Sequence, residues 1–394
     1  MKKLAGLTFI VLAIGLFLFV FYNQSRFSKT NRTFSPYSIL ASSWAKYKAQ
    51  FIENGRVIDH SQNNITTSEG QSYGLLRAVW IDDKQAFDEI WQWTNTTIKR
   101  PDDNLFGWRW GLKQDGTYGF LEDGGGNTAS DADVDIALAL IFASKRWNDP
   151  KYLDATKPIL RDIWELEVDQ VNGKNYMVAG NWAKGGEKLI INPSYFAPYA
   201  WRIFAEVDRD RDWNSLITPG YELLSLSGKE KLDRGYAVGL PPNWMGLRKD
   251  SGKLENANLP NLTTDYSFDA MRTPFRIALD YKWFKDPRAL VYLAENYKLL
   301  DDFYVKHNKL STTYAHDGAD IDHNENPAMY ATSLGYFTLV HPDRADKIYQ
   351  EKIIKLYAGD KDTFNPDIPY YEQNWLWFGT ALYHDFLINL YSNN

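Results

Sequence analysis

A helical repeat of apolar residues constrains the fold of this 394-residue chain more than any other feature of its sequence. In residues 132–147, four apolar side chains follow one another at intervals of three or four positions, namely Ile136, Leu140, Ala143 and Trp147. This spacing places them on one face of an α-helix. The same periodicity predicts further helices at 37–53, 70–81, 84–98, 151–164, 194–206, 211–226, 269–282, 287–304, 325–338, 343–357 and 373–391.

Segments rich in Gly, Asn, Asp and Pro join these helices, and no linker or low-complexity run follows Pro36. Only residues 175–179 and 187–191 have the composition of short strands, as candidates for a hairpin. An even number of helices without a linker favours helical hairpins arranged in a ring. We therefore predict an all-α fold, an (α/α)6 barrel of about twelve helices, formed by a single domain over residues 37–394.

The N-terminal segment has a different character. Two lysines precede an uncharged, largely apolar run at residues 4–22, close to the ~20 residues with which a helix crosses a bilayer. The positive end predicts a cytoplasmic N-terminus and an exported remainder. No small-residue cleavage site follows the run. We therefore expect residues 1–26 to be a signal anchor rather than a cleaved signal peptide, and residues 27–36 to be a tether.

Composition excludes several classes of function. The net charge is −6, opposite in sign to that of most nucleic-acid-binding proteins. No cysteine is present, which excludes disulfides, thiolate metal sites and cysteine nucleophiles. The six histidines show no zinc-binding spacing. Aromatic residues make up 15% of the chain, which suits either a large helical core or a site that stacks flat ligands such as sugar rings.

Three acidic clusters lie where a connection meets a predicted helix. In the first, residues 67–74 (TSEGQSYG), Ser68 is placed to cap a helix and Glu69 falls in its first turn. The helix dipole favours an acid at such a position without any catalytic role. Small residues around Glu69 leave room for a ligand to approach, so both interpretations stay open.

The second cluster contains Asp131, Asp133 and Asp135 at the start of a predicted helix. Asp131 and Asp135 share one helix face, whereas Asp133 points elsewhere. The spacing invites comparison with a calcium loop, but the glycine and closing glutamate of an EF-hand are absent. Acids on a solvated helix start are the simpler interpretation.

In the third cluster, Asp269 begins a predicted helix and Arg272 follows one turn later. The simple interpretation is an ion pair within the helix that contributes about 0.2–0.5 kcal/mol. The functional interpretation is an acid that Arg272 positions in a pocket formed by Tyr266 and Phe268.

A carboxylate pair is the best-supported catalytic group, because other chemistries lack their residues. Residues 70–74 match Gly-x-Ser-x-Gly, but the segment before them is too polar for the strand that a nucleophile elbow requires. Carboxylate pairs beside aromatic side chains are typical of enzymes that cleave glycosidic bonds. The candidate stacking residues are Trp91, Trp93, Trp108, Trp110, Trp182, Tyr195, Trp244 and Trp375.

Taken together, the three clusters resemble the signature blocks of glycoside hydrolase family 8. The blocks and the similar stretches between them are, in order, 67–74, 106–110 (FGWRW), 129–147 (beginning ASDAD), 192–195 (NPSY) and 266–276. The resemblance covers roughly residues 37–390. It implies an (α/α)6 barrel and an inverting, endo-acting hydrolase of β-1,4-linked polysaccharides.

The resemblance also implies roles for single residues. Glu69 matches the general acid, Asp269 matches the general base, and Asp131 matches the aspartate that holds the central sugar. The residues that we expect to bind substrate are Asp133, Trp108, Trp110, Tyr195, Tyr266 and Arg272. The resemblance implies no metal or other cofactor.

Two other functions remain open. A membrane-tethered carbohydrate-binding protein of exopolysaccharide assembly would bind oligosaccharides without releasing new reducing ends. A polysaccharide lyase would need a base and a group that neutralises a uronate. If the protein is a glycoside hydrolase, as the resemblance implies, we expect it to be a monomer. Its partners would be a polysaccharide and the membrane, not nucleic acid. We expect it at the cell membrane, single-pass with an extracytoplasmic catalytic domain, or secreted if the N-terminal segment is cleaved.

Overall fold

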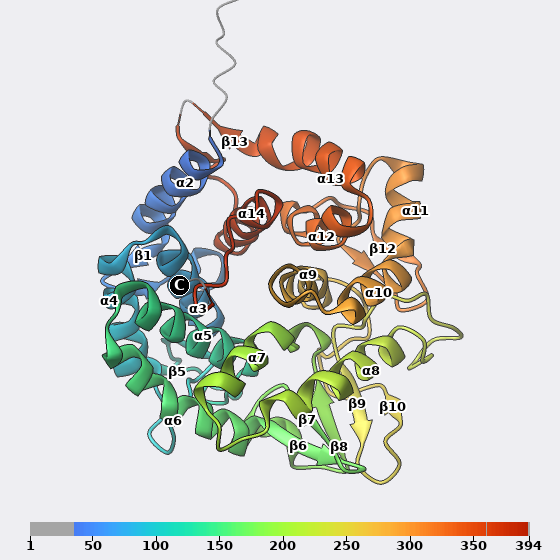
Figure 1. Ribbon diagram of the computed structural model, residues 1–394, viewed down its shortest axis with the longest axis horizontal. Helices are drawn as coiled ribbons and strands as arrows, with labels where there is room; N and C mark the ends of the chain where they lie inside the picture. The colour runs from blue at the N-terminus through green and yellow to red at the C-terminus, as the bar shows by residue number, and fades with distance from the viewer. Residues whose placement is uncertain (1–34, 360, 393–394) are drawn as a thin grey trace, which may run out of the picture.

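The computed structural model describes residues 35–359 and 361–392, and within these ranges the fold is mostly helical, with thirteen α-helices (Figure 1). The predicted signal anchor, residues 1–26, and nearly all of the predicted tether, residues 27–36, lie outside the described residues. Within the described ranges, no helix has both the length and the apolar character needed to cross a membrane.

The helices follow the predicted segments closely. They are Pro36–Phe51 (α2), Ser68–Ile81 (α3), Lys84–Trp93 (α4), Ser130–Trp147 (α5), Pro150–Glu167 (α6), Pro198–Val207 (α7), Ile217–Ser227 (α8), Thr273–Phe284 (α9), Pro287–Asn296 (α10), Lys298–His307 (α11), Pro327–Val340 (α12), Pro342–Ile348 (α13) and Tyr370–Tyr383 (α14). The segment predicted as one helix at 287–304 is two helices, α10 and α11. The backbone leaves helical geometry at Tyr297, where φ is −107° and ψ is 13°.

The helices form two concentric layers (Figure 1). The inner layer contains α3, α5, α7, α9, α12 and α14, and the outer layer contains α2, α4, α6, α8, α10 and α13. Most chain-adjacent helices pack as an inner and an outer partner, as α3 does with α4 and α5 with α6. The inner helices also contact one another around the centre, so the core of the protein lies between and around them.

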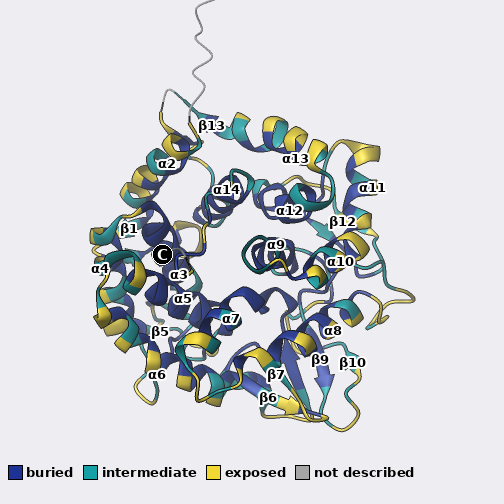
Figure 2. Cartoon of the chain, viewed as in Figure 1, coloured by how far each residue is buried: buried dark blue, intermediate teal, exposed yellow. Residues whose placement is uncertain are grey.

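Burial explains why the inner helices α5 and α12 show weak amphipathic patterns. Every residue of α5 from Ser130 to Ala143 is buried, and α12 is buried from Ala328 to Phe337. Figure 2 shows exposed residues mainly on the outer helices. A helix surrounded by other helices is apolar on all sides, whereas an outer helix needs only one apolar stripe.

Two glycines allow the inner helices to approach closely. A Cβ atom on Gly335 of α12 would lie 2.2 Å from the carbonyl oxygen of Pro274 in α9. A Cβ atom on Gly379 of α14 would lie 2.6 Å from the carbonyl oxygen of Ala331 in α12. A larger residue at either position would force the two backbones apart.

Short strands connect the helices. They are Ile52–Glu53 (β1), Arg56–Val57 (β2), Thr66–Thr67 (β3), Arg109–Leu112 (β4), Tyr118–Phe120 (β5), Val168–Val171 (β6), Lys174–Met177 (β7), Lys188–Ile191 (β8), Met245–Arg248 (β9), Leu254–Glu255 (β10), Thr313–Tyr314 (β11), Asp320–Asp322 (β12), Tyr357–Ala358 (β13) and Thr363–Phe364 (β14). The two predicted strands are present as β7 and β8, but they are not partners in a hairpin. β7 pairs with β6, and β8 pairs with β9, each antiparallel.

One small sheet positions the first acidic cluster. Strand β4 pairs with β3 on one side and with β5 on the other, all antiparallel. Strand β3 ends at Thr67, and α3 begins at the next residue. The Thr67 hydroxyl accepts a hydrogen bond from the Gly70 N–H at 3.0 Å and caps the helix. The cap is therefore Thr67 rather than Ser68, and Glu69 lies in the first turn of α3 as predicted.

Candidate active site

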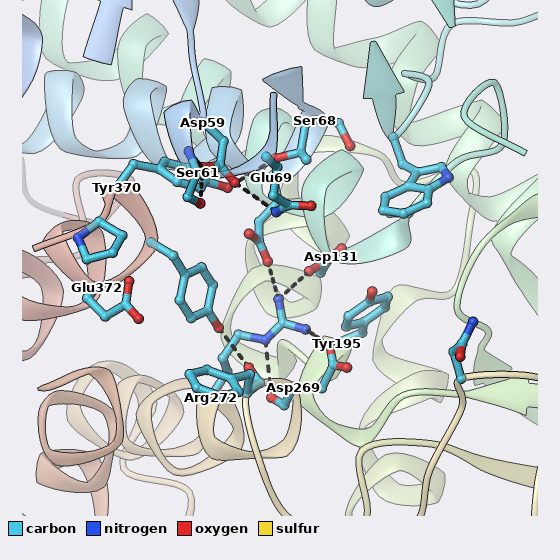
Figure 3. Close-up of a pocket in the computed structure, with 18 of the residues that line it drawn as sticks. Asp59, Ser61, Ser68, Glu69, Asp131, Tyr195, Asp269, Arg272, Tyr370 and Glu372 are labelled. Atoms are coloured by element: carbon cyan, nitrogen blue, oxygen red, sulfur yellow. Dashed lines mark hydrogen bonds and ion pairs between the residues drawn. The ribbon is translucent and has the colours of Figure 1, made fainter. Parts of the chain in front are cut away.

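A pocket of about 540 Å³ brings side chains from all three acidic clusters together (Figure 3). Glu69 enters it from the first turn of α3, and Asp131 from the first turn of α5. Asp269 and Arg272 enter it from the 3-10 turn that precedes α9. The sequence predicted that Asp269 begins a helix, and the structure places it at this turn, four residues before α9.

Arg272 is the centre of the site. Its Nη1 lies 2.5 Å from Glu69 Oε2 and 2.9 Å from Asp131 Oδ2. Its Nη2 lies 2.7 Å from Asp269 Oδ1. The predicted ion pair with Asp269 is therefore present, but it is not an isolated surface pair: one guanidinium, whose side chain is 2% exposed, contacts three carboxyl groups. We call Glu69, Asp131, Asp269 and Arg272 the pocket cluster.

The three acids differ in their access to solvent. The side chain of Glu69 is 22% exposed and that of Asp269 is 34% exposed. The side chain of Asp131 is only 3% exposed. Glu69 and Asp269 can therefore exchange protons with a bound molecule, whereas Asp131 offers little more than one edge to the pocket.

Burial controls the protonation of Glu69. It raises the pKa of this carboxyl to about 7, with Arg272 opposing the shift and the charges of Asp131 and Asp269 adding to it. Burial thus outweighs the favourable ion pair. A carboxyl group with a pKa near neutral is protonated in a large fraction of molecules at the pH where most enzymes work, which suits a proton donor.

Asp269 has two hydrogen-bond donors as well as a buried environment. Burial raises the pKa of its carboxyl, while Arg272 and the indole of Trp244 lower it. Trp244 Nε1 donates to Asp269 Oδ2 at 3.0 Å, and Arg272 donates to the other oxygen. Both donors favour the ionised form of Asp269 and fix the plane of its carboxylate.

Aromatic side chains form part of the pocket wall. Trp108, Tyr195 and Trp244 line it, as does Phe268, which is 42% exposed. Trp108 is held by a hydrogen bond from its Nε1 to the carbonyl of Gly124 at 2.9 Å. Flat rings held in this way can stack against sugar rings.

Three residues that we expected to bind substrate lie outside the pocket. Asp133 is fully buried, because two positions along α5 from Asp131 turn a side chain to the other side of the helix. Tyr266 is 1% exposed and lies in the core. Trp110 is partly exposed, but its ring stacks on that of Tyr118 at 5.2 Å instead of facing the pocket. Of the other stacking candidates, Trp91, Trp93, Trp182 and Trp375 do not line the pocket.

One wall of the pocket, at the start of α14, was not predicted from the sequence. Tyr370, Tyr371 and Glu372 line the pocket, and Tyr371 donates its hydroxyl to the carbonyl of Phe268 at 2.7 Å. Asp59 also lines the pocket. The only available signal was a tyrosine pair and a glutamate after a proline, just ahead of a helix predicted to begin at residue 373.

A carboxylate pair beside aromatic rings, in a mostly helical protein, defines a class of enzyme that cleaves glycosidic bonds. Comparison with known proteins supports this class and narrows it. The model of the family described as "Glycosyl hydrolases family 8" matches residues 22–374. The chain belongs to this family, as the resemblance of its three blocks predicted.

Individual relatives agree with the family. The chain is 34% identical over 247 residues to an endoglucanase of Cellulomonas uda. The matched region covers 62% of this chain and 64% of the relative. It is 30% identical over 316 residues to endoglucanase A of Acetivibrio thermocellus. That match covers 76% of this chain and 61% of the relative. The chain thus spans about three fifths of the length of the curated relatives it matches.

A solved structure shows the same fold. Endoglucanase Cel10 of Klebsiella pneumoniae, a family 8 glycosyl hydrolase, superposes with a TM-score of 0.68 at 26% identity. The superposition covers 87% of this chain and 99% of the Klebsiella chain. The mostly helical architecture is therefore that of the family.

Proposed function

We propose that this protein is an endo-acting glycoside hydrolase that cleaves β-1,4 linkages of a polysaccharide with inversion of configuration. The observation that carries the proposal is the meeting of Glu69 and Asp269 at one guanidinium in a solvent-accessible pocket. The curated relatives are endoglucanases, which supports a β-glucan as the substrate.

Glu69 is the general acid in this proposal. Its pKa of about 7 keeps a proton available for the departing glycosidic oxygen. As the glycosidic bond breaks, negative charge develops on the departing oxygen. The proton moves from Glu69 to that oxygen. The carboxylate that remains is stabilised at once by Arg272, which already contacts it.

Asp269 is the general base. The hydrogen bonds from Arg272 and Trp244 hold it as a carboxylate, ready to take a proton from a water molecule that attacks the anomeric carbon. Inverting enzymes keep the two carboxyl groups ~6.5–9.5 Å apart to admit this water. Asp131, held by Arg272, accepts hydrogen bonds from the hydroxyls of the sugar at the point of cleavage.

The aromatic walls support binding of several sugar units. Trp108, Tyr195 and Tyr371 all line the pocket and come from segments far apart in the chain, just before β4, in the turn before α7 and in α14. Many weak stacking contacts on both sides of the cleavage point favour cleavage inside a chain. The two helical layers support the finer description of the fold as an (α/α)6 barrel of helical hairpins.

The remaining expectations belong to the same proposal. Residues 1–26 would anchor the protein in the cell membrane, residues 27–36 would form a tether, and residues 37–394 would act outside the cytoplasm on a polysaccharide. The apolar run at 4–22 and its preceding lysines support this location.

A reducing-end assay tests the activity. Residues 27–394 should release reducing ends from one or more of cellulose, mixed-linkage β-glucan, xylan and chitosan, and Glu69→Gln should not. The first product observed by proton NMR should be the α anomer. An initial β anomer would show retention and reject the assignment of the base, whereas oligosaccharide binding without new reducing ends would favour a carbohydrate-binding protein.

A further inference from the structure

A second pair of acids lies beneath the pocket and takes no part in the proposed reaction. Asp133 belongs to α5, and Glu167 is the last residue of α6. Both residues are fully buried. Asp133 Oδ1 accepts a hydrogen bond from the Phe106 N–H at 3.1 Å, and Glu167 Oε1 accepts one from the Thr128 hydroxyl. Each carboxyl group therefore has one oxygen paired with a different segment of the chain.

The other two oxygens lack a donor. Asp133 Oδ2 and Glu167 Oε2 are buried without a hydrogen-bond partner among the described residues. Helices α5 and α6 pack against each other, and the two carboxyl groups are near neighbours. Two carboxylate oxygens repel, so this contact is favourable only when one of the groups carries a proton. We call Asp133 and Glu167 the sealed pair.

The charged groups around the sealed pair do not neutralise it. Arg100 pairs with Asp103 and donates to a backbone carbonyl. Lys184 donates to two backbone carbonyls near the end of α6. The charges of Asp103 and Asp131 add negative potential at Glu167. The pair thus differs from the pocket cluster, where an arginine compensates the acids.

The sealed pair connects two segments that form the pocket. Phe106, which donates to Asp133, lies two positions before Trp108 in the chain. Thr128, which donates to Glu167, lies three positions before Asp131. The Thr128 hydroxyl also accepts a hydrogen bond from the Asn181 N–H at 2.9 Å, so the network extends to a third segment.

We propose that Asp133 and Glu167 share one proton, and that this proton-sharing pair is a positioning device that holds the segments bearing Trp108 and Asp131 in their pocket geometry. When the proton leaves, two negative charges face each other in the interior and the segments separate. The pair makes no contact with substrate. It acts through the residues that it holds in place.

The electrostatics of the pair agree with this geometry. Burial raises the pKa of Glu167 to about 8 and raises the pKa of Asp133 well above its ordinary range. A carboxyl group whose pKa is higher in the folded protein stabilises the fold fully below its ordinary pKa of 4.5. That stability is lost as the pH rises through about 8.

Thermal unfolding tests the pair independently of any activity. Glu167→Gln keeps a hydrogen-bonding side chain of the same shape but cannot titrate. Between pH 5 and 8, the unfolding equilibrium constant of the wild type should rise relative to that of Glu167→Gln, by up to about tenfold per pH unit. Glu165→Gln, an exposed position on the same helix, is the matched control and should follow the wild type. Parallel curves for the wild type and Glu167→Gln would overturn the proposal.

Oligosaccharide binding tests the positioning role, and this second readout rests on the proposed function. In a Glu69→Gln background, which removes the titration of the general acid, affinity for a cello-oligosaccharide should fall above about pH 8. Adding Glu167→Gln should remove this fall, whereas adding Glu167→Leu should weaken binding at every pH. If Glu69→Gln bound no oligosaccharide, the proposed function would be rejected. The unfolding experiment would still test whether Asp133 and Glu167 share a proton. A pH-independent affinity in Glu69→Gln would overturn the positioning role.

Discussion

The pocket cluster and the sealed pair each take one acid from helix α5, where Asp131 and Asp133 lie two residues apart. Both contain a glutamate whose pKa burial raises, to about 7 for Glu69 and to about 8 for Glu167. The pocket cluster has an arginine and is open to solvent, whereas the sealed pair has neither. A raised pKa by itself therefore does not distinguish the proposed general acid from a buried acid outside the pocket, whereas solvent access and a compensating charge do.

Helix α5 creates this difference because Asp131 and Asp135 lie on one of its faces and Asp133 lies on another. Asp131 faces Arg272 and the pocket, and Asp133 faces Glu167. Asp135, one turn after Asp131, forms two hydrogen bonds with Arg276 at 2.9 and 2.7 Å. Each acid is buried to within 3% of complete burial, so the partner, and not the degree of burial, separates their roles.

The largest expected effect compares isosteric amides in the two groups. Glu69→Gln removes the transferable proton, so its kcat/KM at pH 6 should fall by about 10²–10⁴-fold. Asp269→Asn should cause a loss of similar size. Glu167→Gln should retain most of its activity at pH 6, because the sealed pair stays hydrogen-bonded. Initial rates of reducing-end release check this, and comparable losses in Glu69→Gln and Glu167→Gln would erase the distinction between the two groups.

Removing the compensating charge should affect stability strongly. Arg272→Met leaves three buried or partly buried acids without their cation and should lower the free energy of unfolding by about 3–5 kcal/mol. Arg248, which pairs with Asp250 at the surface, provides the control: Arg248→Met should cost far less, because exposed ion pairs contribute little to stability. Denaturant titration measures both. Equal losses in the free energy of unfolding would mean that Arg272 stabilises the pocket cluster no more than Arg248 stabilises its surface ion pair.

The first decline of activity with rising pH should report Glu69, because its pKa of about 7 lies below the pKa of Glu167, about 8. The general acid works only when protonated, so kcat/KM should decline above its pKa of about 7, by about tenfold per pH unit. Rates between pH 5 and 9 on a soluble β-glucan test this. The midpoint of this decline should be the same in Glu167→Gln, and a midpoint that moves with that substitution would assign it to the sealed pair.

The smallest expected effect concerns the donor to Asp269. Trp244→Phe removes the indole N–H, so the pKa of Asp269 should rise and the acidic limb of the pH profile should move upward by at most about one pH unit. Trp182, whose ring lies 6.3 Å from that of Trp244, serves as the control because no hydrogen bond joins it to Asp269. An unchanged acidic limb in Trp244→Phe would mean that this indole does not tune the base.

Local patterns in the sequence predicted most of the helical architecture. Helix α5 was expected over 132–147 and spans Ser130–Trp147, because apolar residues three or four positions apart are typical of a helix. Helices α10 and α11 were expected as one helix, since the periodicity does not reveal the change of backbone conformation at Tyr297. The pairing of β7 and β8 also depended on partners far away in the chain.

The site was predicted unevenly for the same reason. Three acids and one arginine stood out at predicted helix starts, namely Glu69, Asp131, Asp269 and Arg272. The structure brings all four into one pocket. Asp133 was expected to bind substrate, yet it lies two helix positions away from a pocket residue and faces the interior. The tyrosines at the start of α14 were missed, because nothing local distinguishes them from aromatic residues of the core.

The sequence by itself determined which segments form helices and which side chains are able to carry protons. These properties depend on residues three or four positions apart, and the chain contains that information locally. Only the tertiary structure decided that Glu69 and Asp269 share Arg272 while Asp133 meets Glu167. These contacts form when the inner helices pack against one another. The pKa of each carboxyl group depends on burial and on distances to other charges, and no single segment of the chain defines those distances.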